Sequence, residues 1–228
     1  YPEQFGAVGN GSTDDTTAIT NFINYLLANP LLEGRLQSKT YAISAALPQV
    51  NVSGFRMIGI GPSSNHDTGS INGSCFKAIT NTGFTMLTVA PTEGASAQRL
   101  DGIHIDGVAF NGDSKAAKGL VVKSIRTSTF NIYAEEFTTT GIELSVVNTL
   151  GDAKDLQDSV FRINGRDIFA GGNVLQVNGT SAANVSLNHF QIVDVVHNSA
   201  TAIVCMNPDN NLWGVVRVYR QLGGTATN

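Results

Sequence analysis

Carboxylate and guanidinium side chains recur at related positions in five apolar segments of the C-terminal half of the chain. The segments can be aligned on one apolar residue each, which is Ile103, Ile132 and Ile163 in three of them. Three residues after these positions stand Asp106, Glu135 and Arg166. Such a group could supply a general acid or base and a cation that orients an acidic ligand. Two carboxyl groups about 5 Å apart also have the geometry of a retaining glycosidase. The alternative is a solvated ion pair without a catalytic role.

Three further side chains lie close to these positions in the alignment. His104 and Arg162 are adjacent to apolar residues of the repeat, and Tyr133 lies two residues before Glu135. Neighbours of an inward-facing strand residue face outward, where aromatic faces can stack on sugars and guanidinium groups can bind hydroxyls or acidic groups. We therefore predict a saccharide site on one outer face. Its predicted catalytic residues are Asp106 and Glu135, and its predicted substrate-binding residues are Tyr133, Arg162, Arg166 and His104.

Histidines and the polar segment 62–74 are the other candidates for a functional role. His104, flanked by isoleucines, is more typical of a surface polar residue than of a general base. No metal site and no cofactor are predicted, because the four histidines are scattered without metal-ligand spacing. If the site lies elsewhere, the polar segment 62–74 is the next candidate. This segment carries His66 and Asp67 and lacks a hydrophobic period, so it is expected to project as a loop.

The aligned segments indicate the elements that position these side chains. They read LDGIHIDGVAF, TFNIYAEEF, VFRINGRDIF, HFQIVDVV and VVRVYRQL. Their apolar anchors are spaced by 29, 31, 29 and 26 residues and are Ile103, Ile132, Ile163, Ile192 and Val218. Such a period, without intervening helix patterns, predicts stacked coils with the four isoleucines in one interior ladder. The alternative is a β-sandwich whose strands happen to be evenly spaced.

One amphipathic helix is predicted near the N-terminus. Ala18, Ile19, Phe22, Ile23, Leu26 and Leu27 form one apolar stripe at helical spacing, and Asn29-Pro30 is a stop signal. Ser12 or Thr13 is the expected N-cap. Asp14 and Asp15 would then lie in the first turn, where carboxylates favour the positive end of the helix dipole. We interpret this acidic pair as helix capping rather than as a catalytic dyad.

The sequence pattern FGAxGxGxxDDTxAI of residues 5–19 resembles the N-terminal segment of the pectate-lyase-like β-helix family, which includes bacteriophage tailspikes and depolymerases. Asn10 stands where that family usually has Asp. The resemblance implies an all-β fold, a right-handed parallel β-helix with an N-terminal capping α-helix. Residues 1–30 would be the turn and cap. Residues 31–228 would be coils that continue into a C-terminal region or a partner chain. It also implies a homotrimer.

Composition limits the classes of partner. Charged residues make up 14% of 228 residues, the net charge is −4 and no basic run occurs, so nucleic acid is not an expected partner. The apolar runs are too short for membrane insertion. Cys75 and Cys205 are far apart near apolar positions, so two buried free thiols are expected rather than a disulfide.

Together these features predict a tailspike-like protein that binds and degrades a host surface polysaccharide, by hydrolysis or by elimination. It would be located in the virion tail or outside the cell, and other virion tail proteins are possible partners. Two alternatives are a non-catalytic structural or receptor-binding β-helix and a secreted pectate-lyase-like enzyme. The Gly-His-Gly and Arg-Ile-Lys triplets of the family's galacturonases do not occur in this sequence, so the resemblance bears more on fold than on reaction type.

Overall fold

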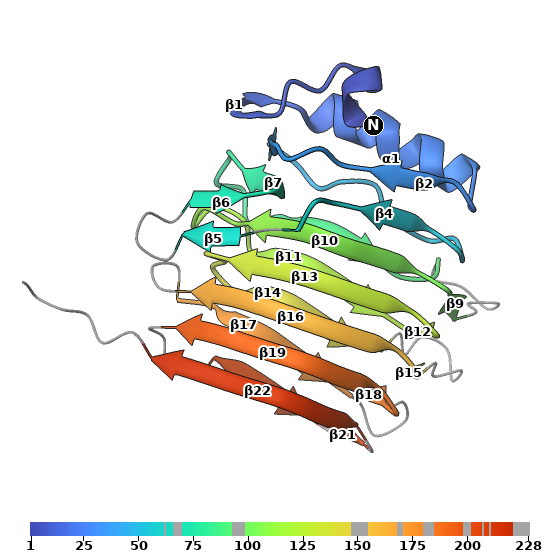
Figure 1. Cartoon of the computed structure of the whole chain (residues 1–228), viewed down its shortest axis with the longest axis vertical. Helices are drawn as coiled ribbons and strands as arrows, with labels where there is room; N and C mark the ends of the chain where they lie inside the picture. The colour runs from blue at the N-terminus through green and yellow to red at the C-terminus, as the bar shows by residue number, and fades with distance from the viewer. Residues whose placement is uncertain are drawn as a thin grey trace, which may run out of the picture.

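The computed structural model describes residues 1–61, 63–65, 70–92, 99–146, 155–167, 171–179, 185–197, 202–206, 208–209 and 211–220. In these residues the chain winds into a stack of coils built mostly from parallel strands, with one α-helix at the N-terminal end (Figure 1). From Leu100 onward, successive coils place their strands in the same three sheets, so strands about 25 to 30 residues apart become neighbours. This arrangement is that of a parallel β-helix, and the parallel pairing excludes the sandwich alternative.

The strands of each sheet are as follows. The first sheet contains β1 (Asn10–Asp14), β2 (Glu33–Arg35), β3 (Thr40–Ile43), β4 (Arg56–Ile58), β7 (Ser74–Ala78), β10 (His104–Asn111), β13 (Thr129–Glu135), β16 (Val160–Asp167), β19 (His189–His197) and β22 (Leu212–Arg220). The second contains β8 (Thr85–Val89), β11 (Lys118–Lys123), β14 (Thr140–Ser145), β17 (Asn173–Asn178) and β20 (Ile203–Met206). The third contains β9 (Leu100–Asp101), β12 (Ile125–Arg126), β15 (Leu156–Gln157), β18 (Val185–Ser186) and β21 (Pro208–Asp209).

Aromatic rings form a continuous stack inside the coils. Phe130, Phe161, Phe190 and Trp213 pair in register across β13, β16, β19 and β22. Their ring centroids are 5.2, 5.3 and 4.1 Å apart along the series. The three phenylalanines are almost completely buried. The predicted alignment of these phenylalanines is thus confirmed, and it places their neighbours on the outer face.

The predicted isoleucine ladder is only partly correct. Ile132 and Ile163 are direct partners, but Val108 rather than Ile103 precedes them and Val193 rather than Ile192 follows them. Ile103 is buried at the corner before β10. The register irregularity between Phe161 and Arg162 causes the one-residue shift at Ile192. Ile103 lies five residues before Val108, and the irregularity between Asp106 and Val108 accounts for only one of them, so the coil is shorter than the predicted spacing. A bulge adds a residue on one strand only, so equal spacing in sequence does not give equal height in the stack.

Four successive corners between the third and first sheets use a left-handed backbone. Gly102, Thr127, Asp158 and Leu187 have φ of 67°, 48°, 51° and 55°. The residue after each corner is held by the next coil: the backbone N–H groups of Ile103, Ser128, Ser159 and Asn188 donate to side-chain oxygens at 3.0–3.2 Å. The acceptors are Ser128, Ser159, Asn188 and Asn211. These bonds satisfy backbone groups that would otherwise be buried without partners.

Leu187, like Thr127 and Asp158, has a Cβ in the strained left-handed region, and its side chain is 56% exposed, so removing it would lose few contacts. We expect Leu187→Gly to raise the free energy of unfolding by about 1 kcal/mol. Urea unfolding monitored by circular dichroism would measure this. Leu212→Gly is the matched control: Leu212 is also exposed but lies in a strand, where glycine should destabilise. Equal losses in both variants would contradict the corner argument.

The N-terminal segment packs on the coils through α1 (Thr16–Ala28) and a short 3₁₀ helix, η1 (Pro2–Phe5). The predicted apolar stripe is confirmed for all but Leu27, which is partly buried. The predicted N-cap is wrong. Residues 10–14 form β1 and pair with β3, and the N-cap is Asp15, whose carboxylate accepts hydrogen bonds from Val8 and Gly9 N–H at 2.7 and 3.0 Å.

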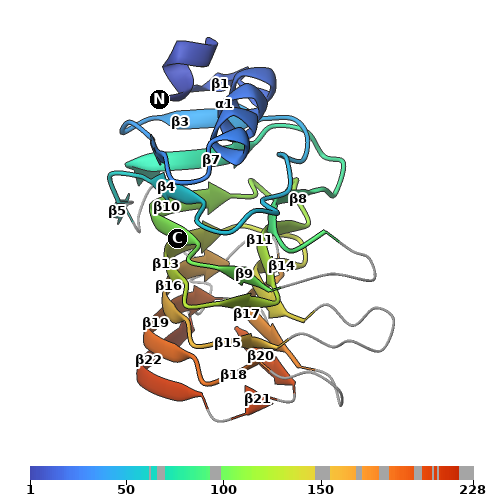
Figure 2. The same ribbon diagram turned by 90° about the vertical axis from the view of Figure 1, so that its right-hand side faces the viewer.

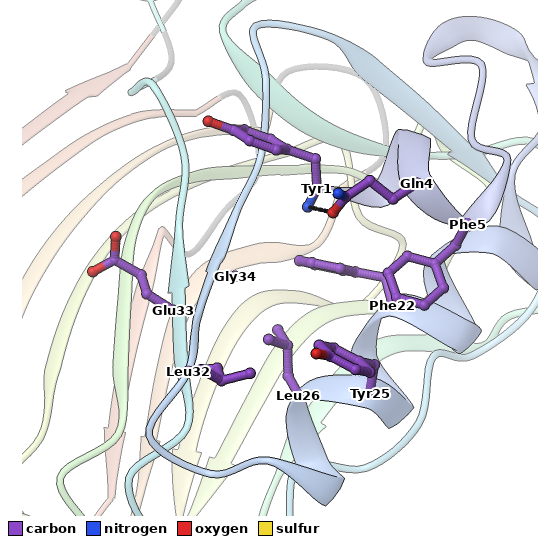
Figure 3. Close-up of a pocket in the computed structure, with 9 residues that line it drawn as sticks. All are labelled: Tyr1, Gln4, Phe5, Phe22, Tyr25, Leu26, Leu32, Glu33 and Gly34. Atoms are coloured by element: carbon purple, nitrogen blue, oxygen red, sulfur yellow. Dashed lines mark hydrogen bonds between the residues drawn. The ribbon is translucent and has the colours of Figure 1, made fainter.

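The close approach of α1 to β2 depends on one glycine. A Cβ at Gly34 would lie 2.3 Å from Leu26 Cδ1 and 2.7 Å from Phe22 Cζ, and Figure 3 shows both side chains beside Gly34. The side chains of α1 therefore share a single core with those of the coils. The boundary predicted at residue 30 between a cap and the coils stays a prediction.

Two other expectations can be compared with the structure. Segment 62–74 contains an antiparallel pair, β5 (Ser63–Asn65) and β6 (Ser70–Asn72); His66 and Asp67 lie outside the described residues. Both cysteines are free, as predicted, but only Cys75 is buried and Cys205 is exposed. In the described part of the chain, no helix is long and apolar enough to cross a bilayer.

Candidate functional site

The outer face of the first sheet carries the residues on which the sequence analysis centred. Along β13, Phe130, Ile132 and Ala134 join the buried core, so Tyr133 and Glu135 project from the opposite face. Strands β10, β13, β16, β19 and β22 lie side by side with their carboxyl ends at the same edge (Figure 1). Side chains near that edge therefore meet across neighbouring coils.

Glu135 is the centre of a buried polar group near this edge. It pairs in register with Asn111 on β10 and with Arg166 on β16. Asn111 Nδ2 donates to Glu135 Oε1 at 2.6 Å, and the Tyr133 hydroxyl donates to Glu135 Oε2 at 3.1 Å. Arg166 Nε lies 4.0 Å from Glu135 Oε2 and 3.7 Å from Glu136 Oε1. We call Asn111, Tyr133, Glu135, Glu136 and Arg166 the Glu135 cluster.

More charges surround the Glu135 cluster. Lys77 is the register partner of Asn111, and its Nζ lies 3.6 Å from Asp113 Oδ2. Lys115 also pairs with Asp113. Glu135 is 2% exposed and Arg166 is 5% exposed. Burying two ionisable groups this deeply lowers stability unless both are well hydrogen-bonded. The Glu135–Arg166 pair on an outer face therefore indicates a functional or a structural role.

The environment of Glu135 favours its protonated form. Burial raises the pKa of Glu135 from 4.5 to about 7, and the neighbouring carboxylates Glu136 and Asp113 act in the same direction. The charge of Arg166 and the hydrogen bond from Tyr133 lower the pKa but do not cancel the effect of burial. At neutral pH this carboxyl group can therefore donate a proton, which a carboxyl group in water cannot do.

The raised pKa predicts how stability depends on pH. Between pH 4.5 and about 7 the folded chain binds more protons at Glu135 than the unfolded chain, so the free energy of unfolding should fall as the pH rises. The loss should be on the order of 3 kcal/mol and complete above about pH 7. Glu135→Gln should remove this part of the pH dependence, which urea unfolding at pH 4.5, 6 and 8 would show. Asp106→Asn keeps Glu135, so its free energy of unfolding should depend on pH as in the wild type. If the free energy of unfolding of Glu135→Gln showed the same pH dependence as that of the wild type, the assignment to Glu135 would be refuted.

The other predicted site residues form a second, more exposed group. Asn131 Nδ2 donates to Asp106 Oδ1 at 2.7 Å, and Arg162 Nε donates to Gln191 Oε1 at 2.7 Å. His104 lies at the start of β10, opposite Thr129. The Arg162 side chain is exposed. Together these side chains form a row of polar groups that crosses four coils, on β10, β13, β16 and β19.

The predicted contact between Asp106 and Glu135 is wrong. Asp106 pairs with Asn131, four residues before Glu135 on β13, which is a separation of about 13 Å along the sheet. The cause is the length of the coil between β10 and β13. Val108 and its partner Ile132 are 24 residues apart, so aligning Ile103 with Ile132 was wrong by five residues, and the bulge around Gly107, whose φ is +65°, accounts for one of the five. The prediction that Glu135 and Arg166 are neighbours is confirmed. Their predicted exposure is wrong, because both are buried.

Three residues of this region were not among the predicted site residues: Asn111, Glu136 and Asp113. Asn111 would have been found if Val108 had been aligned with Ile132, because the same register places Asn111 opposite Glu135. Glu136 directly follows Glu135 and has a positive φ of 56° at the end of β13. Among the described residues, no group of three or more His, Cys, Asp or Glu side chains is arranged to hold a metal ion.

Known proteins resemble this chain in structure rather than in sequence. No protein-family model matches the sequence, and no curated protein matches it at a significant level. The A-module of the mannuronan C-5 epimerase AlgE4 from Azotobacter vinelandii aligns over 98% of each chain, at 12% identity, with a TM-score of only 0.31. ORF18 of Geobacillus virus E2 aligns with a TM-score of 0.57 at 18% identity over 86% of this chain. The chain thus shares its fold with a viral protein and spans 42% of that protein's length.

Proposed function

We propose that this chain belongs to a virion protein that binds a host surface polysaccharide and cleaves it, with Glu135 as the proton donor. The observation that carries the proposal is the pKa of about 7 at Glu135, held between the Tyr133 hydroxyl and the Arg166 guanidinium on the outer face of a β-helix. In the proposed step the Glu135 proton passes to the glycosidic oxygen as the bond from that oxygen to carbon breaks. In hydrolysis water then bonds to that carbon and gives up a proton; in elimination the neighbouring carbon loses a proton and a C=C bond forms. The fold shared with a viral protein supports the virion setting.

The exposed row supplies the binding surface in this proposal. Asp106, Asn131, Arg162 and Gln191 already bond to one another in pairs, so their donors and acceptors are held in place before a glycan arrives. A row that crosses coils about 4.8 Å apart runs along the stack, which suits an extended chain of sugars. His104 lies at the β10 end of this row, although opposite Thr129 rather than opposite Asn131.

Several finer features belong to the same proposal. The β-helix is right-handed, as are nearly all parallel crossovers. Helix α1 caps the first coil, which is supported by the burial of Ile19, Phe22 and Ile23 in the common core. The protein assembles as a homotrimer in the virion tail, on the basis of the resemblance of residues 5–19.

A second candidate function is glycan binding without cleavage. It is favoured by the 2% exposure of Glu135, since a sugar can reach this carboxyl group only if the side chains around it move. In that case the Glu135 cluster would serve to join three coils through Asn111, Glu135 and Arg166. A structural role of this kind would make the cluster important for stability and irrelevant to turnover.

One experiment separates these functions. Purified protein is incubated with capsule and lipopolysaccharide from candidate hosts, and the products are assayed for new reducing ends and for the absorbance of unsaturated uronates. Reducing ends without the absorbance indicate hydrolysis, and both signals together indicate elimination. Binding without either signal supports the second function and refutes cleavage.

A further inference from the structure

A polar groove lies on the outer face of the second sheet, away from the Glu135 cluster. It has a volume of about 390 Å³ and is lined by Gln49, Asn51, Thr88, Ala90, Pro91, Thr92 and Lys123. Strands β8 and β11, which supply Thr88 and Lys123, are on the side of the stack opposite β10 and β13 (Figure 2). Its volume is at the lower end of the range for ligand sites, about 300–1,000 Å³.

The upper wall of the groove is an extended segment that continues the second sheet. Val50 N–H donates to Thr88 O at 2.8 Å, and Ala90 N–H donates to Val50 O at 3.0 Å. Val50 is fully buried, so the alternation of side chains turns Gln49 and Asn51 outward. The wall is thus anchored by backbone bonds that do not involve the side chains facing the groove.

The amide groups of this wall are held in one orientation. Gln49 Nε2 donates to the carbonyl oxygens of Ala90 and Pro91 at 2.9 and 3.3 Å, and Asn51 Nδ2 donates to Thr92 Oγ1 at 3.1 Å. Because these N–H groups are engaged within the protein, the amide oxygens are left as acceptors for ligand hydroxyl groups. Thr88 and Thr92 add hydroxyl groups, which can donate or accept.

Lys123 supplies the one positive charge of the lining. It ends β11, where its register partner is Ser145. Within the described part of the chain, Lys39, Lys77, Lys115 and Lys118 all form ion pairs, whereas Lys123 has no carboxylate within 4.0 Å. The seven lining residues also include no acidic side chain. Among the residues that the structure describes, the Lys123 ammonium therefore has no counterion.

We propose that this groove is a second carbohydrate-binding site, specific for a saccharide unit that carries a carboxylate. The Lys123 ammonium pairs with the ligand carboxylate, and the amide oxygens and threonine hydroxyls bind the ring hydroxyl groups. This site does not depend on Glu135 and involves no cleavage. It would hold an acidic polysaccharide on a different face of the β-helix from the proposed cleavage site.

The test compares an acidic trisaccharide with a neutral one of the same linkage and with an inorganic anion. Isothermal titration calorimetry is carried out with trigalacturonate, with the neutral α-1,4-galactotriose, and with inorganic phosphate. Wild type should bind trigalacturonate at least ten times more tightly than either of the others. Equal binding of the neutral trisaccharide would overturn the role of the charge, and equal binding of phosphate would overturn the assignment to a saccharide.

Variants place the binding in the groove. Lys123→Gln should weaken trigalacturonate binding at least tenfold, and so should Asn51→Asp, which adds a negative charge at an exposed position without enlarging the side chain. Lys118→Gln is the matched control, because it removes the same charge from the other end of β11. Unchanged affinity in both groove variants, with melting temperatures like the wild type, would overturn the proposal. Glu135→Gln should keep the wild-type affinity in the groove, so failure of the cleavage proposal would leave this result intact.

Discussion

Ile163→Asp should leave the chain without a stable folded state. Ile163 has no exposed surface and sits between Ile132 and Val193 in the interior ladder, next to the aromatic stack of Phe161. An aspartate there would be buried without a partner for its charge, and the substitution would also remove the large apolar side chain of Ile163. The expected loss exceeds about 4 kcal/mol, a large part of the 5–15 kcal/mol that typically stabilises a folded protein. Circular dichroism and limited proteolysis would measure it.

The neighbouring position supplies the control for this prediction. Arg162→Asp introduces the same side chain one residue earlier, on the exposed face, and should change the free energy of unfolding by no more than about 1 kcal/mol. Ile163→Val should cost only about 0.5–1.5 kcal/mol, because it removes a single methyl group. If Ile163→Asp melted like the wild type, the interior ladder would be wrong.

Glu135→Gln should abolish polysaccharide cleavage if Glu135 is the proton donor. Loss of a general acid typically lowers the rate by about 10²–10⁴-fold. Glutamine keeps the shape; its amide oxygen can still accept from Asn111 and its NH2 group can donate to the Tyr133 hydroxyl, so folding and glycan binding should persist. In the wild type the rate should fall as the pH rises above about 7, because the group then loses its proton. Rates of reducing-end formation over pH 5–9 would test both expectations.

Asp106→Asn is the discriminating control for the cleavage assay. Asp106 lies about 13 Å along the sheet from Glu135, too far for the paired carboxylates of a glycosidase, which lie about 5–9.5 Å apart. This variant should weaken glycan binding and leave the turnover number close to that of the wild type. Full activity in Glu135→Gln would remove the Glu135 cluster from the mechanism.

Much of the fold could be predicted from local patterns in the sequence. The apolar stripe of α1 requires only helical spacing, and the recurrence of Phe130, Phe161 and Phe190 indicated coils with that side of each strand inside. Alternation along a strand then places Tyr133 and Glu135 on the outer face. Where two coils have equal length and no bulge lies between the compared residues, as for Glu135 and Arg166, counting residues also gave the correct neighbour.

Register and burial, in contrast, depend on contacts between distant residues. The coil from β10 to β13 is shorter than the 29-residue spacing of Ile103 and Ile132, so Val108 is the partner of Ile132 and Asp106 lies apart from Glu135. The second sheet brought Gln49 and Asn51 to Lys123 across more than 70 residues of sequence.

In a strand without a bulge, such as β13, the sequence by itself determined which side faces the core, because that follows from the two-residue alternation of a strand and needs no partner. Only the tertiary structure decided which outward side chains meet across coils, because that is set by backbone hydrogen bonds between strands and is shifted by every bulge. It also decided the chemistry of Glu135, since a carboxyl group acquires a pKa of about 7 only when neighbouring coils exclude water from it.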